Sequence, residues 1–212
     1  MDARIQPYGE RSYLLCDLKE SALRLLQVAV ERDPPSDLQE YVSGYETFLL
    51  VFKRPVGARI LEKWVRGVRS SLRSGDRSIR KIEVPVCYDG ADLKAVAKAT
   101  GLSERAVVDI HRGGDYRVRM MGFAPGFPYL DGLDRRLHLD RKTSPRKRIE
   151  PGSVAIGGTH AGIYSVASPG GWHLLGRTDL ELFSPKNARQ DPWDVRSVFA
   201  LSPGDRVKFV EV

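Results

Sequence analysis

The stretch GFAPGFPYL, residues 122–130, places two prolines, two glycines and three aromatic side chains directly after the strand-like run Tyr116–Met121. Glycine permits positive φ angles and proline fixes φ, so their alternation forces a rigid loop of defined shape. Two later stretches share this chemistry, Ser153–Tyr164 and Ser168–Trp172. Such loops either form the walls of a pocket or are plain hairpin turns packed on a core.

Short apolar runs separate these turn signals, and this pattern is typical of a β-barrel or a β-sandwich. We expect strands at Ile82–Tyr88, Tyr116–Met121, Ser153–Ile156, Gly162–Val166, Trp172–Gly176, Leu180–Phe183 and Arg206–Val212. Two short helices, Asp92–Thr100 and Glu104–Arg112, precede most of these strands. The second part of the chain is therefore predicted to be rich in β-structure.

The first eighty residues alternate short strands with amphipathic helices. The expected strands are Ser12–Leu18 and Thr47–Phe52, and the expected helices are Glu20–Glu31 and Gly57–Leu72. Two helices against a small sheet make a two-layer α+β module. The polar stretch 73–78 is a candidate linker. We therefore expect an α+β protein with an α/β domain over residues 1–80 and a second domain over residues 81–212.

Length and composition narrow the class of protein. The chain has 212 residues, of which 42% are hydrophobic, and this apolar content argues against disorder. No run approaches the roughly 18 apolar residues of a membrane span, and the N-terminal MDARIQP lacks a signal-peptide apolar region. Cys16 and Cys87 lie far apart, so two reduced thiols are expected rather than a disulfide framework. The expected location is the cytoplasm, with no membrane contact.

The net charge of +7 is concentrated in one segment. Residues 135–148 hold seven Lys and Arg against Asp140 alone, a local charge of +6. Residues 92–111 resemble a helix-turn-helix, but the second helix carries two acids and one Arg, which is unsuited to phosphate and base contacts. A helical hairpin packed on a sheet is favoured over DNA binding. The charge therefore points to an anionic ligand or a partner surface.

The histidines and the standard motifs give weaker signals. None of the four histidines has metal-ligand spacing and there is no CxxC, so no metal site is expected. His111 ends a helix, and His160 lies in a glycine-rich stretch that suits either a polar site residue or a solvated loop. There is no GxSxG elbow, no GxxxxGK[ST] phosphate loop and no GxGxxG fingerprint.

A series of short motifs stands in the same order as in a known family. These motifs are GFAPGFPYLDGL at 122–133, SPR at 144–146, PGSVAI at 151–156, GIY at 162–164, SPGGW at 168–172, GRT at 176–178 and SPGDRVKF at 202–209. On them the chain resembles the KipI/PxpB family, also called allophanate hydrolase subunit 1. The family commonly has a Gly-Gln pair where this chain has Thr159-His160, and a proline where it has Ser165.

The resemblance implies a fold and a set of partners. The fold would be an N-terminal ferredoxin-like α/β domain followed by a C-terminal cyclophilin-like β-barrel. PxpB-like proteins work with a PxpC-like subunit and a PxpA-like subunit, and together they open 5-oxoproline to glutamate with ATP as cofactor. KipI-like members are instead inhibitors of a sensor histidine kinase, and related modules serve carboxyl transfer in urea carboxylase.

The resemblance, the residue types and their placement together suggest roles for individual residues. In an oxoprolinase subunit, Arg146 and Arg148 would hold a carboxylate or phosphate. Phe127, Gly170, Gly171 and Trp172 would shape the substrate pocket, and His111 or His160 would move protons. Because the chain has no phosphate loop, we expect it to have little activity alone. The alternatives of a kinase inhibitor and of a carboxyl-transfer or allophanate-type amide-processing subunit stay open.

Overall fold

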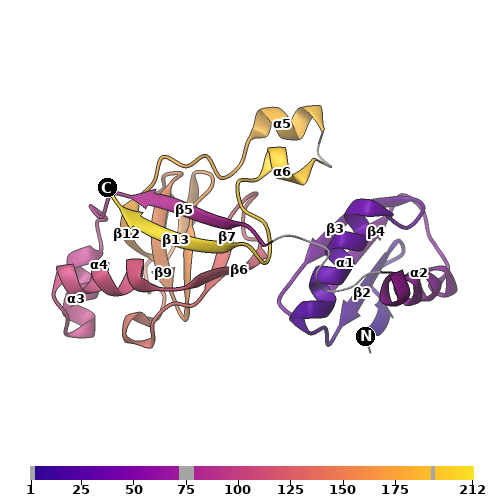
Figure 1. The fold of residues 1–212 in the computed structure, drawn as a ribbon, viewed down its shortest axis with the longest axis horizontal. Helices are drawn as coiled ribbons and strands as arrows, with labels where there is room; N and C mark the ends of the chain where they lie inside the picture. The colour runs from indigo at the N-terminus through magenta and orange to yellow at the C-terminus, as the bar shows by residue number, and fades with distance from the viewer. Residues whose placement is uncertain (1–2, 72–78, 192–193) are drawn as a thin grey trace. The chain divides into compact units, whose positions relative to one another are not determined.

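A computed structural model describes residues 3–71, 79–191 and 194–212. The chain divides into two compact units, Met1–Ser78 and Ile79–Val212, and Figure 1 traces both from the N-terminus to the C-terminus. The stretch 73–78, expected as a linker, lies outside the described residues.

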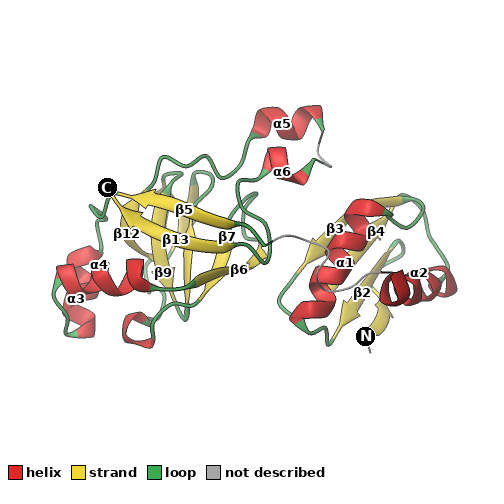
Figure 2. Ribbon diagram, viewed as in Figure 1, coloured by secondary structure: helices red, strands yellow, loops and turns green. Residues whose placement is uncertain are grey.

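The first unit is a four-stranded sheet with two helices. Its elements are β1 (Arg4–Pro7), β2 (Ser12–Cys16), α1 (Glu20–Arg32), β3 (Leu38–Ser43), β4 (Phe48–Phe52) and α2 (Ala58–Ser71). Figure 2 shows the helices in red beside the yellow sheet. The strand order is β1-β2-β4-β3, and all neighbouring pairs are antiparallel. Because β4 lies between β2 and β3, the unit has the split βαβ arrangement of ferredoxin-like folds, with β1 at one edge.

Alternation along the strands builds the core of this unit. Phe48, Leu50 and Phe52 point to one face of the sheet and are buried. They pack with Leu26 of α1 and Leu61 of α2, which are almost completely inaccessible. The apolar stripes of both helices thus cover the same set of strand residues.

The second unit is a seven-stranded, nearly closed barrel. Its strands are β5 (Lys81–Val86), β6 (Tyr116–Met121), β7 (Pro128–Asp131), β9 (Ser153–Gly157), β10 (His160–Ile163), β12 (His173–Arg177) and β13 (Arg206–Glu211). They follow the order β12-β9-β10-β7-β6-β13-β5. The end strands meet at one bridge, where Cys87 and Arg177 exchange two backbone hydrogen bonds of 2.9 Å. This bridge closes the sheet on itself.

Smaller elements surround the barrel. Two further strands, β8 (Arg146–Ile149) and β11 (Ser168–Gly170), pair as a separate ribbon. The helices are α3 (Leu93–Thr100), α4 (Glu104–Gly113), the 3₁₀ turn η1 (Arg135–Leu137), α5 (Pro185–Gln190) and α6 (Val195–Val198). Figure 1 shows α3 and α4 together at one end of the barrel, where they contact β12 and β13. In the turn between them, Gly101 adopts a φ of 70° and the Ser103 hydroxyl accepts from the backbone N–H of Ala106.

The α+β class, with an α/β unit followed by a β-barrel, is confirmed. The strand expected at Leu180–Phe183 is wrong, because among these residues only Phe183 is bridged, to Phe199. Five strands were missed, namely β1, β3, β7, β8 and β11. β7 begins inside the Gly/Pro-rich stretch, where Pro128 is tolerated as the first residue of a strand. β8 begins in the basic segment, whose charges obscure a strand that pairs with β11 in a two-stranded sheet.

The barrel closure predicts a sensitive glycine. A methyl group added at Gly176 would overlap the backbone carbonyl oxygen of Cys87, whereas one at Gly113 of α4 meets open space. Gly176→Ala should therefore lower the free energy of unfolding by about 1–3 kcal/mol, as for other forced overpacking. Gly113→Ala should change it by less than about 0.5 kcal/mol. Urea unfolding followed by circular dichroism measures both, and equal stabilities would contradict the closure.

Candidate functional site

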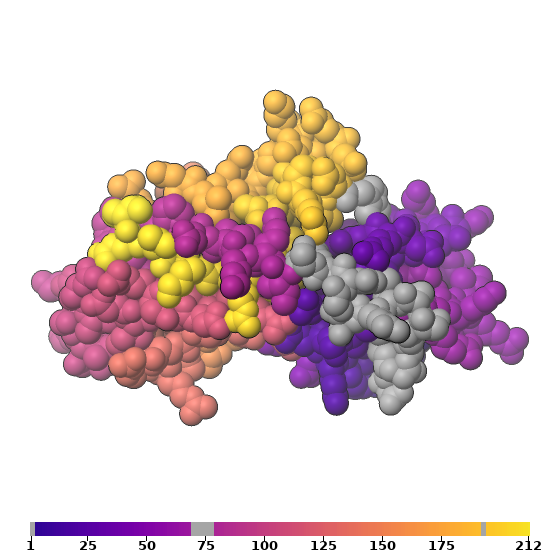
Figure 3. Space-filling view, in the orientation of Figure 1, coloured from indigo at the N-terminus to yellow at the C-terminus, as the bar shows by residue number. Residues whose placement is uncertain are grey.

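A pocket of about 280 Å³ lies in the second unit, and its walls combine aromatic and basic side chains. We call it the aromatic pocket; it is lined by Phe123, Phe127, Tyr129, Arg141, Lys142, Pro145, Tyr164, Pro169, Gly170, Gly171 and Trp172. A larger hollow of about 610 Å³ lies over β5 and β13, but no aromatic residue lines it. Figure 3 shows atoms of these two strands side by side at the surface. The aromatic pocket is the stronger candidate, since ligand sites combine apolar walls with a few polar groups.

Edge-to-face ring contacts build the floor of the pocket. Phe127 is 2% exposed, and its ring centroid lies 5.5 Å from that of Trp172 and 5.3 Å from that of Tyr164. Tyr129 completes the group, with its centroid 5.1 Å from that of Phe127. These rings pack in the favourable T-shaped geometry, which gives the pocket a preformed floor.

Local sequence chemistry places these rings. The chain turns tightly at 122–127, where the N–H of Gly122 donates to the carbonyl of Phe127. Within this turn Phe123 has a φ of 67°, a left-handed conformation that bulky residues rarely adopt. On β10, a Cβ atom at Gly162 would lie 2.9 Å from ring atoms of both Phe127 and Trp172. Only glycine lets this strand pass so close beneath the two rings.

Two cations of the basic segment reach the pocket. The guanidinium carbon of Arg141 lies 5.9 Å from the ring centroid of Trp172, within cation–π range. Arg141 forms no ion pair with any residue in the described parts of the chain. Lys142 instead donates its amine to Asp92 Oδ1 at 2.9 Å, and its backbone N–H donates to Gly171 at 2.7 Å. Arg141 is therefore the pocket cation without a carboxylate partner among the described residues, while the Lys142 ammonium keeps further donors beside the one on Asp92.

Asp92 stabilises this wall through hydrogen bonds. Its carboxylate is 4% exposed and also accepts from Arg146 Nη2 at 2.8 Å and from the backbone N–H of Leu174 at 2.9 Å. Burial by itself would raise the pKa of Asp92, but the hydrogen bonds from Arg146, Leu174 and Lys142 outweigh it and lower the pKa to about 2. The carboxylate is thus ionised at neutral pH.

The two histidines expected to move protons lie in different surroundings. His160 Nε2 lies 3.2 Å from Asp131 Oδ1, and its ring centroid lies 6.1 Å from that of Tyr129. Burial lowers the pKa of His160, and Asp131 partly opposes this effect. His111 is completely buried, and its Nδ1 lies 2.7 Å from the hydroxyl of Tyr88. His111 therefore does not reach the pocket or His160.

The structure places the other expected site residues as follows. Phe127, Gly170, Gly171 and Trp172 all line the aromatic pocket. Arg146 is not one of the lining residues and donates a hydrogen bond to Asp92 instead. Arg148 is exposed and pairs with Glu150 at 2.7 Å, away from the pocket lining.

Sequence reasoning missed several residues of the site. Arg141 and Lys142 belong to the basic segment, so the charge count contained a signal for them, but it did not rank them above their neighbours. Tyr129 and Tyr164 stood in the quoted motifs. Asp92 carried no local signal, because its partner Lys142 lies fifty residues away in sequence.

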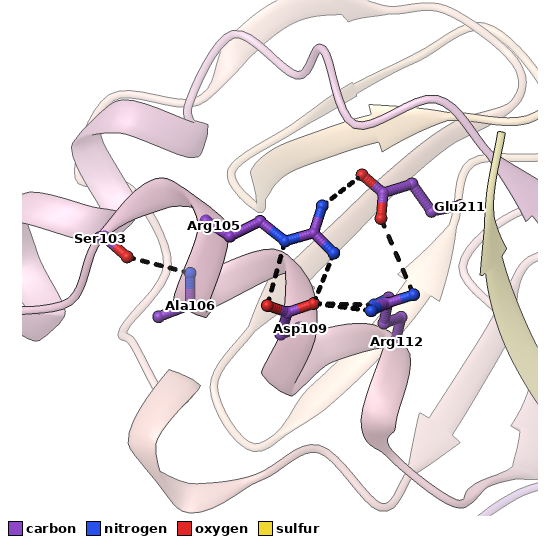
Figure 4. Close-up of polar contacts among 6 residues, drawn as sticks. All are labelled: Ser103, Arg105, Ala106, Asp109, Arg112 and Glu211. Atoms are coloured by element: carbon purple, nitrogen blue, oxygen red, sulfur yellow. Dashed lines mark hydrogen bonds and ion pairs between the residues drawn. The ribbon is translucent and has the colours of Figure 1, made fainter.

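The helix that resembles a DNA-recognition helix has its cations paired within the chain. Figure 4 shows Arg105 of α4 bonded to Asp109 and to Glu211 of β13, at 2.7 and 2.9 Å. Arg112 likewise lies 2.9 Å from Asp109. These pairs leave little free positive charge on α4 for phosphates, which argues against DNA binding by this helix.

The residues that the structure describes contain neither a metal-binding cluster nor a membrane-spanning helix. Among them, no group of three or more His, Cys, Asp or Glu side chains is arranged to hold a metal ion. In the same residues, none of the helices has the length and apolar character needed to cross a bilayer.

Burial of His111 predicts a pH dependence of stability. Burial lowers the pKa of His111 to about 3, so the folded protein keeps it neutral while the unfolded chain protonates it near pH 6.5. Its contribution is thus complete above pH 6.5 and lost as the pH falls toward 3, at up to about 1.4 kcal/mol per pH unit. His111→Gln should be less stable at pH 7 but show a shallower loss between pH 6.5 and 4. Urea unfolding across this range tests it, and parallel curves would refute it.

Comparison with known proteins fits this geometry. The family model "Carboxyltransferase domain, subdomain C and D" matches residues 3–193. The B subunit of 5-oxoprolinase from Escherichia coli O157:H7 is 48% identical over 195 residues, covering 90% of this chain and 85% of that protein. The corresponding B subunit from Bacillus subtilis is 47% identical over 136 residues, covering 63% of this chain and 53% of its own length.

A solved structure agrees with these matches. TTHA0988 superposes with a TM-score of 0.80 at 37% identity, over 95% of this chain and 40% of that chain. This chain thus spans less than half of TTHA0988. By these matches, the chain belongs to the family of carboxyltransferase C and D subdomains that includes the 5-oxoprolinase B subunits.

Proposed function

We propose that this chain is the B subunit of an ATP-dependent 5-oxoprolinase and that the aromatic pocket binds the lactam substrate. The observation that carries the proposal is Arg141, which stacks on Trp172 at the pocket without an ion-pair partner in the described residues. 5-Oxoproline is a small lactam ring with one carboxylate. The aromatic walls suit the ring, and a guanidinium suits the carboxylate.

The residues of the pocket take distinct roles in this proposal. Arg141 pairs with the carboxylate, in place of the Arg146 and Arg148 expected from the sequence. Phe127 and Trp172 bound the ring. His160 is the better placed of the two histidines for proton transfer, because it borders Tyr129 of the wall whereas His111 is sealed in the core.

ATP and partner subunits complete the proposed reaction. Opening an unactivated lactam is slow, and this slowness is a chemical reason to couple the reaction to phosphorylation by ATP. The sequence has no standard phosphate loop. We therefore assign the chemistry of ATP to a complex with a PxpC-like and a PxpA-like subunit, consistent with the word "subunit" in the names of the relatives.

A reconstitution assay tests the function. Glutamate release from 5-oxoproline and ATP is measured with this chain alone, with its two partner subunits, and with the partners without this chain. We expect release only in the complete mixture. Release by this chain alone would refute the subunit assignment, and none in the complete mixture would refute the oxoprolinase assignment and favour a carboxyl-transfer role.

Substitution of Arg141 tests the site. Arg141→Gln removes the charge that pairs with the carboxylate, so the KM for 5-oxoproline should rise at least about tenfold, equivalent to about 1.4 kcal/mol. Lys147→Gln is the matched control, because Lys147 is an exposed cation of the same basic segment outside the pocket lining. Steady-state kinetics of the complex gives both values, and equal KM values for the two variants would place the substrate elsewhere.

A further inference from the structure

Asp92 occupies the N-cap position of α3 but does not cap the helix. An aspartate there usually accepts a hydrogen bond from the first turn of its own helix. The Asp92 side chain makes no such bond. It turns instead toward β12 and the pocket wall, where it accepts from Leu174, Lys142 and Arg146. The buried carboxylate therefore stabilises the pocket wall and does not cap its own helix.

Hydrogen bonds to β12 fix the position of Asp92. Its backbone N–H donates to the carbonyl of Leu174 at 3.0 Å, and the Leu174 N–H returns a bond to its Oδ2. The Gly90 N–H donates to Leu175 at 3.1 Å. The segment that carries Asp92 is thus bonded along β12, next to the strand end that closes the barrel.

The local charge balance is uneven. One carboxylate oxygen, Asp92 Oδ1, accepts from two cations, Lys142 at 2.9 Å and Arg146 at 2.8 Å. The Nη1 atom of Arg146 is buried and has no hydrogen-bond partner among the described residues. With Arg141 beside them, the cations at this wall outnumber the buried carboxylate. The wall therefore retains positive charge toward the pocket, while Asp92 offsets the repulsion between Lys142 and Arg146.

We propose that Asp92 is a positioning residue of the aromatic pocket: it holds the amine of Lys142 at the wall and so sets the affinity of the pocket for a carboxylate ligand. Asp92 does not line the pocket itself. It acts through Lys142, whose backbone is held separately by Gly171. The kinetic part of the proposal rests on the proposed function, and the first test does not.

Chemical labelling tests the position of Lys142 without any ligand. In the wild-type chain, acetylation of Lys142 by acetic anhydride should be several-fold slower than that of exposed Lys147, because the Lys142 amine is bonded to a buried carboxylate. In Asp92→Asn the Lys142 rate should rise several-fold while the Lys147 rate stays constant. Peptide mass spectrometry follows both residues. Equal wild-type rates for the two lysines overturn the proposal whether or not the variant folds.

The Asn substitution is informative because it keeps the size of the side chain. Oδ1 faces two donors and Oδ2 faces the Leu174 N–H, so either orientation of the amide sets its NH₂ group against a donor. Asp134→Asn is the matched control. Asp134 is an N-cap aspartate of η1 whose pKa is also lowered to about 2, by its hydrogen bonds with Arg136, and it lies outside the pocket lining.

A double-mutant cycle separates positioning from general destabilisation. In the reconstituted complex, Asp92→Asn should raise the KM for 5-oxoproline about tenfold with kcat within about twofold, and Lys142→Met should do the same. Adding Asp92→Asn to Lys142→Met should change KM no further, because Asp92 acts through that amine. Asp134→Asn should leave KM unchanged.

The outcomes distinguish this proposal from the proposed function. A wild-type complex that releases no glutamate refutes the oxoprolinase assignment, and Asp92 is then judged on the labelling rates. An active wild-type complex whose Asp92→Asn and Lys142→Met effects multiply independently overturns the positioning role and leaves the oxoprolinase assignment intact.

Discussion

The parallel pairing of β5 with β13 is the constraint on which the second unit depends. Six residue pairs, from Arg206 with Lys81 to Glu211 with Val86, join the first strand of the unit to the last. At the start of this pair, Arg80 donates to the buried carboxylate of Asp205, which also accepts from the N–H of Ser202 at 2.8 Å. These strands are far apart in sequence, so their pairing joins the two ends of the unit, and the bridge from Cys87 to Arg177 then closes the barrel.

The closure also determines where the pocket wall stands. Immediately after β5, Cys87 bridges to Arg177, and the chain then runs along β12 to Asp92. A carboxylate delivered to this place meets Lys142 and Arg146 from the basic segment. Ionic contact across fifty residues of sequence is thus a consequence of barrel geometry. Isolated, such a buried carboxylate would be costly, and its three donors offset that cost.

The aromatic floor depends on a different constraint, the close approach of backbone to rings. Phe127 and Trp172, which pack with Tyr164, occupy space that a side chain at Gly162 would fill. Their T-shaped contacts leave the rings little freedom to collapse into the aromatic pocket. The pocket therefore exists before a ligand binds. Arg141 is the cation of its wall that has no ion-pair partner in the described parts of the chain.

The sequence by itself determined the order of the α/β unit and the barrel, the family, and the loops that carry Phe127, Gly170, Gly171 and Trp172. The order of the units and the loops follow from short windows, through side-chain periodicity and the φ limits of glycine and proline. The family, and the choice of a barrel over a sandwich, come from the resemblance of the ordered motifs. Only the tertiary structure decided which cations face the pocket, that His111 is buried, and that Asp92 supports the wall. A count of charges cannot choose between Arg141 and Arg148, because the direction of each side chain depends on strand pairings far away in sequence.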